Sequence, residues 1–256
     1  MSTTSVKTWV EREGTLARLR LARPKANILD ETMIDALRAA LDARTENKKV
    51  RAVLVDHEGP HFSFGASVEE HLPASCEKML KRLHALINRM LDWPVPLLFA
   101  VRGQCLGGGL EFALAGNFLF ASPDAQFGQP EMKLGVFAPA ASCLLPARIG
   151  QARAEDLLYS GRSIDAQTAL AWGLANQLAD DPAAAALEYF DRHLAGKSAS
   201  SLALAVRAAR EPFATAAKRR LAEVEALYLK ELMHTRDAVE GLQAFVEKRA
   251  PLWENR

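Results

Sequence analysis

The order of short apolar runs and helical patterns constrains the fold of this 256-residue chain most strongly. Residues 17–21 alternate apolar and basic side chains with period two, which predicts a half-buried strand. The apolar runs at 50–55 and 97–101 are typical of buried strands. Apolar residues recur at helical spacing over 33–41, where Asp30 is the expected N-cap, and over 78–93. Strands that alternate with helices along the chain predict an α/β fold.

The chain beyond Gly150 has a different pattern, which is almost purely helical. Asp165 predicts the start of a short helix that ends at Gly173. Pro212 predicts the start of the longest helix, separate from an alanine-rich segment at 199–210. The longest helix carries a broad apolar stripe of Leu221, Val224, Leu227, Tyr228 and Leu232. We therefore expect this C-terminal helical region to pack on more than its own domain.

Charge and composition exclude several classes of function. The chain has 32 Lys and Arg against 31 Asp and Glu, so it lacks the general positive field that holds a polyanion. No apolar run approaches the ~18 residues that a membrane span needs, and the first residues lack a secretory signal. The three cysteines are far apart and form no C-x-x-C motif, which is typical of a reducing compartment. We expect a cytoplasmic protein that binds neither nucleic acid nor a membrane.

A metal site is not expected either. His57 and His61 are four residues apart but stand on a Gly-Pro loop rather than on one helix face. Cys76, Cys105 and Cys143 have no partner at zinc-ligand spacing, and structural roles are the expectation for all three.

Three glycine-containing patches carry the candidate chemistry, at residues 62–70, 102–111 and 125–131. The triple glycine 107–109 lies between a predicted strand and a predicted helix, where free N–H groups favour an anion or a developing oxyanion. Glu111 lies in the first turn of that helix, and Glu131 follows a Gln-Pro pair after the next strand. Two carboxylates near an oxyanion hole suit proton transfer to and from carbon, one as base and the other as acid. The residues therefore favour lyase or isomerase chemistry.

Together these patches resemble the enoyl-CoA hydratase (crotonase) superfamily along most of the chain. The matching segments are residues 23–27, 62–70, 103–116, 125–135, 149–150, 160–166 and 172–175. The resemblance implies an α/β crotonase (ClpP-like) spiral of ββα units as the catalytic core over residues 1–198. It also implies a helical trimerisation region over 199–256, and therefore a homo-oligomer that is a trimer or a dimer of trimers. An acyl-CoA substrate is implied, with no separate cofactor because coenzyme A is part of the substrate.

The resemblance also implies individual roles. The backbone N–H groups of Ala66 and Gly108 would form the oxyanion hole for the thioester carbonyl. Glu111 and Glu131 would hold a water molecule between them, with Glu131 as the expected proton donor and Glu111 orienting or deprotonating the water. Their joint presence favours water addition. The residues implied in binding the thioester and coenzyme A are Lys25, Ala66, Ser67, Val68, Gly108, Phe137 and Pro139. Whether Phe245 and Lys248 complete the coenzyme A site of a neighbouring chain stays open.

Departures from the common pattern narrow the acyl group. Phe64-Gly65-Ala66-Ser67 stands where ordinary enoyl-CoA hydratases have Ala-Gly-Ala-Asp, and residues 138–143 replace Pro-Gly-Ala-Gly-Gly-Thr. Both changes predict a stiffer, more apolar cavity. Residues 134–142, 224–228 and 237–242 resemble the hydratases of cyclohexa-1,5-diene-1-carbonyl-CoA, which act in anaerobic benzoyl-CoA degradation. The alternatives are a general short-chain enoyl-CoA hydratase or isomerase, and a crotonase-fold RNA-binding protein.

Overall fold

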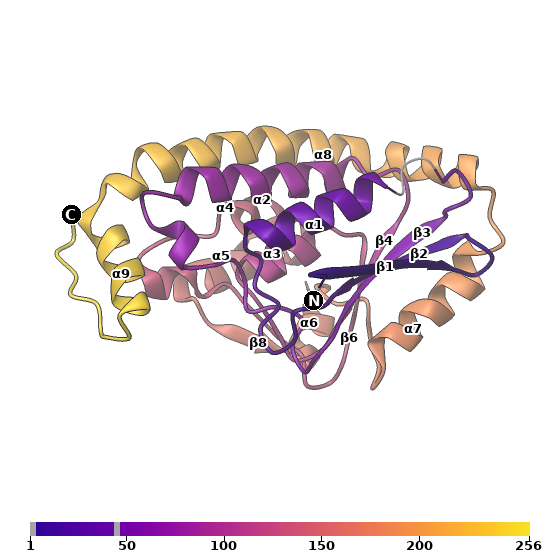
Figure 1. Cartoon of the computed structure of the whole chain (residues 1–256), viewed down its shortest axis with the longest axis horizontal. Helices are drawn as coiled ribbons and strands as arrows, with labels where there is room; N and C mark the ends of the chain where they lie inside the picture. Colours follow the sequence, from indigo (N-terminus) through magenta and orange to yellow (C-terminus); the bar gives the residue numbers. More distant parts are fainter. Residues whose placement is uncertain (1–3, 44–46) are drawn as a thin grey trace.

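Two β-sheets form the scaffold of the protein (Figure 1), for which a computed structural model describes residues 4–43 and 47–256. The larger sheet has the strand order β1 (Val6–Glu11), β2 (Leu16–Leu21), β3 (Ala52–His57), β4 (Leu97–Val101), β6 (Phe118–Ala121) and β9 (Gln177–Leu178). The β1–β2 pair is antiparallel, and the other neighbours are parallel. The smaller sheet contains β5 (Gln104–Leu106), β7 (Gln126–Gly128) and β8 (Ser163–Asp165), with β7 and β8 antiparallel.

Helices surround both sheets. They are α1 (Glu31–Asp42), α2 (Cys76–Leu91), α3 (Gly108–Leu114), α4 (Pro139–Ile149), α5 (Gln151–Ser160), α6 (Ala166–Trp172), α7 (Pro182–Tyr189), α8 (Ala199–Lys230) and α9 (Arg236–Val246). Short turns of other helix types are η1 (Glu69–His71), η2 (Pro130–Leu134), η3 (Phe190–Leu194) and η4 (Leu232–His234). Figure 1 shows α8 lying along α2, and α9 at the end of the molecule that carries the C-terminus. The predicted α/β fold class is confirmed.

Local capping explains where several helices begin and end. Asp30 accepts a hydrogen bond of 2.9 Å from the Met33 N–H at the start of α1, and Asp165 accepts one of 2.7 Å from Thr168 N–H at the start of α6. Gly173 closes α6 with a φ of +81°, a conformation that glycine adopts without steric cost. The three boundary signals in the sequence are therefore confirmed.

The two faces of the larger sheet pack against different helices. One face joins the main core with α1, α2 and α4, and contributes Ala17, Leu19, Val53, Val55 and Phe99. The opposite face packs on α7 and η3, and contributes Leu16, Leu54, Leu98, Ala100 and Phe120. Because both faces are covered, the central strands are apolar on both sides.

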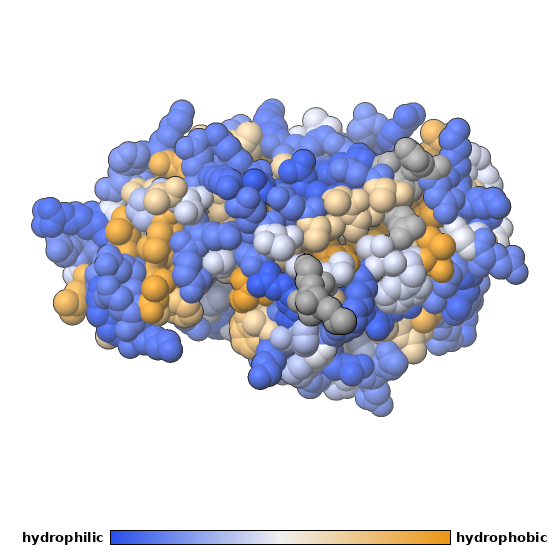
Figure 2. Space-filling view, viewed as in Figure 1, coloured by the Kyte–Doolittle hydropathy of each residue, from blue (hydrophilic) through white to orange (hydrophobic). Residues whose placement is uncertain are grey.

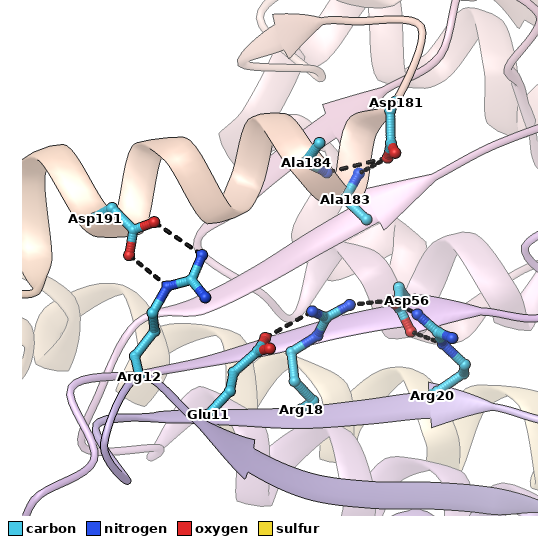
Figure 3. A network of polar contacts seen from close by, with 9 residues as sticks. All are labelled: Glu11, Arg12, Arg18, Arg20, Asp56, Asp181, Ala183, Ala184 and Asp191. Carbon is cyan, nitrogen blue, oxygen red and sulfur yellow. Dashed lines mark hydrogen bonds and ion pairs between the residues drawn. The ribbon is translucent and has the colours of Figure 1, made fainter.

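The alternating pattern of residues 17–21 predicted a half-buried strand, but strand β2 is almost fully buried. Arg18 is only 4% exposed, because β1 and β3 flank it and their carboxylates neutralise it. Its guanidinium donates to Glu11 Oε1 at 2.7 Å and also to Asp56, while Arg20 donates to Asp56 Oδ1 at 2.7 Å (Figure 3). Both guanidinium groups also lie over the ring of Trp9. Period-two alternation thus reflected an ionic layer in which Arg18 and Asp56 are buried, although the Arg20 side chain stays 34% exposed.

The predicted break before Pro212 is also wrong, because α8 runs through it as one helix of 32 residues. Pro212 removes the hydrogen bond to the Ala208 carbonyl. Pro212 and Ala208 are both exposed, so water can solvate the Ala208 carbonyl. Arg210 anchors the same turn by donating to the Gly116 carbonyl at 3.2 Å. None of the helices in the described part of the chain is long and apolar enough to cross a membrane.

Candidate active site

A small cavity of about 60 Å³ lies between the loop that carries Ala66, helices α2, α3 and α9, and the short helix η2. Its volume exceeds the roughly 10–15 Å³ that a water molecule needs. The lining is mostly apolar, with two carboxylates and one imidazole in it. The lining residues are Phe64, Gly65, Ala66, Val68, His71, Leu80, Leu83, Gly107, Gly108, Glu111, Pro130, Glu131, Leu134, Val136, Phe137, Pro139 and Leu242.

Glycines bring two backbone segments together at one wall of the cavity. Gly65 has a φ of +107°, and a Cβ there would lie 3.0 Å from the Leu106 carbonyl. A Cβ on Gly108 would lie 3.0 Å from the backbone nitrogen of Ala66. Over the described ranges 4–43 and 47–256, neither the Ala66 nor the Gly108 N–H donates to a protein acceptor. The N–H of Ala66 on its loop and that of Gly108 at the start of α3 are therefore both available to a ligand oxygen, as an oxyanion hole requires.

The loop that carries Ala66 is held by buried polar side chains. Ser63 Oγ donates to the Asn27 carbonyl at 2.8 Å and accepts from Gly65 N–H at 3.1 Å. Asn27 Nδ2 donates to the carbonyls of Glu58 and His61 at 3.1 and 3.0 Å. Ser63 and Asn27 are both fully buried. Sequence reasoning missed this support; its only signal was the small polar residues that stand just before the glycine turn.

Two arginines hold the other end of α3. Arg148 of α4 donates to the carbonyls of Asn117 and Gly116, the former at 3.1 Å. Arg210 of α8 donates to the carbonyls of Ala115 and Gly116. Burial lowers the pKa of both arginines, that of Arg210 to about 10. Positive groups at the C-terminal end complement the helix dipole, so they stabilise the position of the α3 N-terminus in the cavity.

Glu111 is buried in the cavity wall and accepts a backbone hydrogen bond there. It is only 3% exposed, and its Oε1 accepts a hydrogen bond of 2.9 Å from the Ala141 N–H in the first turn of α4. Burial raises the pKa of Glu111, while the Ala141 N–H and the charge of His84 oppose that rise. The positive end of α4 acts in the same direction.

Glu131 faces the same cavity from η2, next to the glycine turn. A Cβ on Gly107, whose φ is +50°, would lie 2.7 Å from Glu131 Oε1. The side-chain amide of Gln129, with its nitrogen turned toward Glu131, lies 3.1 and 3.0 Å from the two carboxylate oxygens. Burial and the nearby Glu111 charge raise the pKa of Glu131 to about 8. At neutral pH Glu131 is therefore mostly protonated, as a general acid must be.

The structure brings most of the sequence-predicted residues together. Ala66, Val68, Gly108, Glu111, Glu131, Phe137 and Pro139 all line the cavity. Ser67 does not line it, and its Oγ donates to Glu69 Oε2 at 3.0 Å. Lys25 is exposed in the turn beside the Ala66 loop, with a φ of +85°. Phe245 and Lys248 are exposed at the far end of α9.

Other lining residues were not predicted because they come from distant helices. Leu80 and Leu83 of α2, Leu242 of α9 and His71 of η1 reach the cavity only through packing. Helical spacing identified the leucines as apolar helix residues, but it carried no information about the cavity that they face.

His57 ends β3 and does not stand on the loop where the sequence analysis placed it, and both His57 and His61 support the backbone. His57 Nε2 and His61 Nδ1 accept hydrogen bonds of 3.2 Å from the N–H groups of Arg102 and Gln104. The three cysteines are free thiols.

Comparison with known proteins gives consistent results. Residues 11–256 match the enoyl-CoA hydratase/isomerase family. The chain is 64% identical over 251 residues to cyclohexa-1,5-dienecarbonyl-CoA hydratase of Thauera aromatica, covering 98% of this chain and 97% of that protein. It is 31% identical over 258 residues to carnitinyl-CoA dehydratase of Citrobacter koseri, covering 96% and 97%.

Solved structures of similar proteins share the fold. An enoyl-CoA hydratase/isomerase from Xanthobacter autotrophicus Py2 superposes with a TM-score of 0.85 at 26% identity, covering 97% of this chain and 98% of that one. An enoyl-CoA hydratase from Bacillus halodurans superposes with a TM-score of 0.86 at 19% identity, covering 94% and 99%. Because the identity is only 19%, the likeness to the Bacillus halodurans structure shows the fold alone.

Proposed function

The chain belongs to the enoyl-CoA hydratase/isomerase family, and from this premise we propose that it is a hydro-lyase acting on cyclohexa-1,5-diene-1-carbonyl-CoA. Water addition would give 6-hydroxycyclohex-1-ene-1-carbonyl-CoA, as a step of anaerobic benzoyl-CoA degradation. The observation that carries the proposal is the 64% identity to the Thauera aromatica hydratase across nearly both whole chains. The carboxylate pair beside two available amides supports it, because water addition needs an acid, a base and an oxyanion hole.

The thioester carbonyl is the first group to be bound. Its oxygen accepts hydrogen bonds from the N–H groups of Ala66 and Gly108, which face the cavity from adjacent backbone segments. These donors polarise the conjugated system, so that negative charge formed in the diene flows onto the oxygen. Each such donor typically lowers the barrier by about 3–4 kcal/mol.

Water then adds across the conjugated diene. Glu111 takes a proton from the water as its oxygen bonds to the β-carbon, and the resulting dienolate is held at the oxyanion hole. Glu131 gives its proton to the far carbon of the diene. The reaction leaves Glu111 protonated and Glu131 ionised, and a proton passing from Glu111 to Glu131 restores the pair. The raised pKa of Glu131 and the hydrogen bond that Glu111 accepts from the Ala141 N–H support this division of roles.

The lining of the cavity favours a flat apolar acyl group. Phe137 and Pro139 form part of its wall together with Val136, and Phe137 is held edge-on against Tyr228 at 5.1 Å between ring centroids. Residues 138–141 contain no glycine, so this segment is stiffer than one with several glycines. Lys25, exposed beside the Ala66 loop, is proposed to approach the phosphates of coenzyme A.

A substrate panel tests the proposal. The purified protein is incubated with the dienoyl thioester and, separately, with crotonyl-CoA, and products are followed by mass spectrometry for a gain of one water. We expect faster turnover of the cyclic dienoyl thioester. Faster turnover of crotonyl-CoA would overturn the cyclic substrate in favour of a general short-chain hydratase.

We also propose that the chain forms a homo-oligomer, a trimer or a dimer of trimers. On α8, Leu204 and Leu227 are exposed, and so are Phe245 and Trp253 near the C-terminus. Figure 2 shows hydrophobic surface gathered at the end of the molecule that carries α9. The free cysteines favour a reducing, cytoplasmic location. Light scattering after size exclusion tests the assembly, and a mass of one chain would refute it.

A further inference from the structure

The C-terminal tail, residues 250–256, is fastened back onto α9. Figure 1 shows it returning along this helix to the C-terminus. Asp237, in the first turn of α9, accepts two backbone hydrogen bonds from the tail, to Oδ1 from the Glu254 N–H at 2.7 Å and to Oδ2 from the Asn255 N–H at 2.8 Å. The first backbone N–H of α9 also donates to the oxygen of Arg256 at 2.7 Å. These contacts hold the tail in one position, although most of its side chains are exposed.

Trp253 of the tail lies against two glycines from different elements. A Cβ on Gly135 would lie 3.0 Å from Trp253 Cζ3, and a Cβ on Gly241 would lie 2.8 Å from Cη2. A side chain at either glycine would therefore crowd the indole. Gly135 follows η2 directly, and Gly241 stands within α9. The indole, which is 44% exposed, thus joins the end of η2 to α9 from the solvent side.

The two elements that Trp253 joins carry part of the cavity wall. Leu134, the last residue of η2, and Leu242 of α9 both line the cavity. Each of them is the chain neighbour of one of the two glycines that the indole contacts. The backbone of Gly241 also lies against the Leu134 carbonyl, with no room for a Cβ between them. The indole is therefore placed to fix the spacing of Leu134 and Leu242.

The cavity must widen to admit an acyl ring. A cavity of about 150 Å³ holds a benzene molecule, whereas this one has a volume of about 60 Å³. Buried polar side chains fix the loop that carries Ala66, and two arginines fix α3. The wall of Leu134 and Leu242 is instead held by the half-exposed indole and its tail. This wall is therefore the one that can yield when a ring binds.

We propose that Trp253 is a positioning residue that limits how far Leu134 and Leu242 can move apart, and so determines the largest acyl group that the cavity accepts. This inference rests on the proposed function, because it concerns the acyl group bound at that same site. Trp253 acts through the two leucines and does not touch the substrate. A single ring fits after a small movement of this wall, whereas two fused rings require η2 and α9 to separate.

The test measures the affinity for two aromatic thioesters that the protein does not turn over. They are benzoyl-CoA, with one ring, and 2-naphthoyl-CoA, with two fused rings, and each is titrated by calorimetry. The parent protein should bind benzoyl-CoA at least about tenfold more tightly than 2-naphthoyl-CoA. Trp253→Ala should reduce this preference by about tenfold, chiefly through tighter binding of 2-naphthoyl-CoA. Trp253→Phe keeps an aromatic ring against both glycines and should keep the preference within about twofold.

Two further variants separate the indole from the rest of the tail. Leu252→Ala is the matched control, because it removes an exposed apolar side chain next to Trp253 and should leave the preference unchanged. Asp237→Asn leaves a single side-chain acceptor for the two N–H groups of the tail. It loosens the tail without changing its apolar side chains, so the preference should fall by less than in Trp253→Ala. This variant also covers the case in which Trp253→Ala fails to fold.

Several results would overturn the proposal. An equal loss of affinity for both thioesters in Trp253→Ala would mean that the indole merely stabilises α9. An unchanged preference in Trp253→Ala, an equal reduction in Leu252→Ala, an increased preference in Asp237→Asn, or a parent protein without any preference would overturn it as well. Because these affinities do not depend on turnover, a protein that selects the single ring but does not hydrate the dienoyl thioester would refute the proposed function and leave the role of Trp253 supported.

Discussion

Gly107 links the backbone of the oxyanion hole to Glu131, so replacing it with alanine should cost both stability and rate. The residue has a φ of +50°, a conformation that costs other residues about 1–3 kcal/mol. The new Cβ would lie 2.7 Å from Glu131 Oε1, whereas ordinary van der Waals contact begins at 3.4 Å. The carboxylate must therefore retreat by the difference of 0.7 Å.

The displacement predicts the size of the kinetic effect. A misplacement of about 1 Å at a reacting group can cost ~100-fold in rate. We therefore expect Gly107→Ala to lower kcat by about 10- to 100-fold in steady-state assays with the dienoyl thioester. Gly14→Ala is the matched control, because Gly14 has a φ of +84° but a Cβ there meets nothing within 4 Å. It should lose stability in urea unfolding without losing rate.

A double-mutant cycle then tests the cause. If Gly107→Ala acts by displacing Glu131, it should have little further effect in a Glu131→Gln background, because the displaced group is already inactive. Full additivity of the two effects would refute the argument. A kcat of Gly107→Ala within twofold of that of the parent protein would also refute the argument, because Glu131 would then not act as the acid from the position that it has in the structure.

Four other outcomes follow from the same geometry. Glu131→Gln should lower kcat by about 10²–10⁴-fold with KM little changed, and an unchanged rate in steady-state assays would exclude it as the acid. Because the folded pKa of Glu131 is raised from 4.5 to about 8, its contribution to stability is fully present below pH 4.5 and is lost as pH rises through 8. Glu131→Gln should therefore gain in Tm relative to the parent protein at pH 9 and not at pH 4.5, and an equal Tm difference at both values would contradict the raised pKa. Phe137→Ala, which opens the cavity wall, should reduce the preference for the dienoyl thioester over crotonyl-CoA by about tenfold in kcat/KM, and an unchanged ratio would remove Phe137 from substrate selection. Arg210→Ala should lower the free energy of unfolding in urea by about 1–3 kcal/mol, because the buried Ala115 carbonyl just after α3 loses its side-chain donor while Arg148 still donates to Gly116. The exposed Arg207→Ala should change it by less than about 0.5 kcal/mol, and equal losses would contradict the role of Arg210.

Features set by neighbours in sequence were predictable. Asp30 and Asp165 cap their helices, and Gly173 ends one, because side-chain capping and a positive φ need only adjacent residues. The failures concern residues whose environment comes from elsewhere. Arg18 is buried because Glu11 and Asp56 arrive from neighbouring strands. The long helix continues through Pro212 because the partly buried Leu202 before it, and Ala214 and Ala217 after it, pack on the rest of the molecule.

The features of the candidate site also fall into those that the sequence predicted and those that it could not predict. The sequence alone identified the glycine turn, Glu111 and Glu131, since these residue types in this order carry recognisable chemistry. It could not reveal that a Cβ on Gly107 would meet Glu131, or that the first turn of α4 donates a hydrogen bond to Glu111.

The physical reason lies in the range of the forces involved. Dihedral preferences, capping and residue chemistry are local properties, so the sequence by itself determined the elements of this protein and its candidate acid, base and oxyanion donors. Burial and charge–charge coupling depend on which distant segments meet. Only the tertiary structure, by placing Glu111 and Glu131 in the wall of one cavity, raised the pKa of both carboxyl groups and fitted Glu131 to hold a proton near neutral pH.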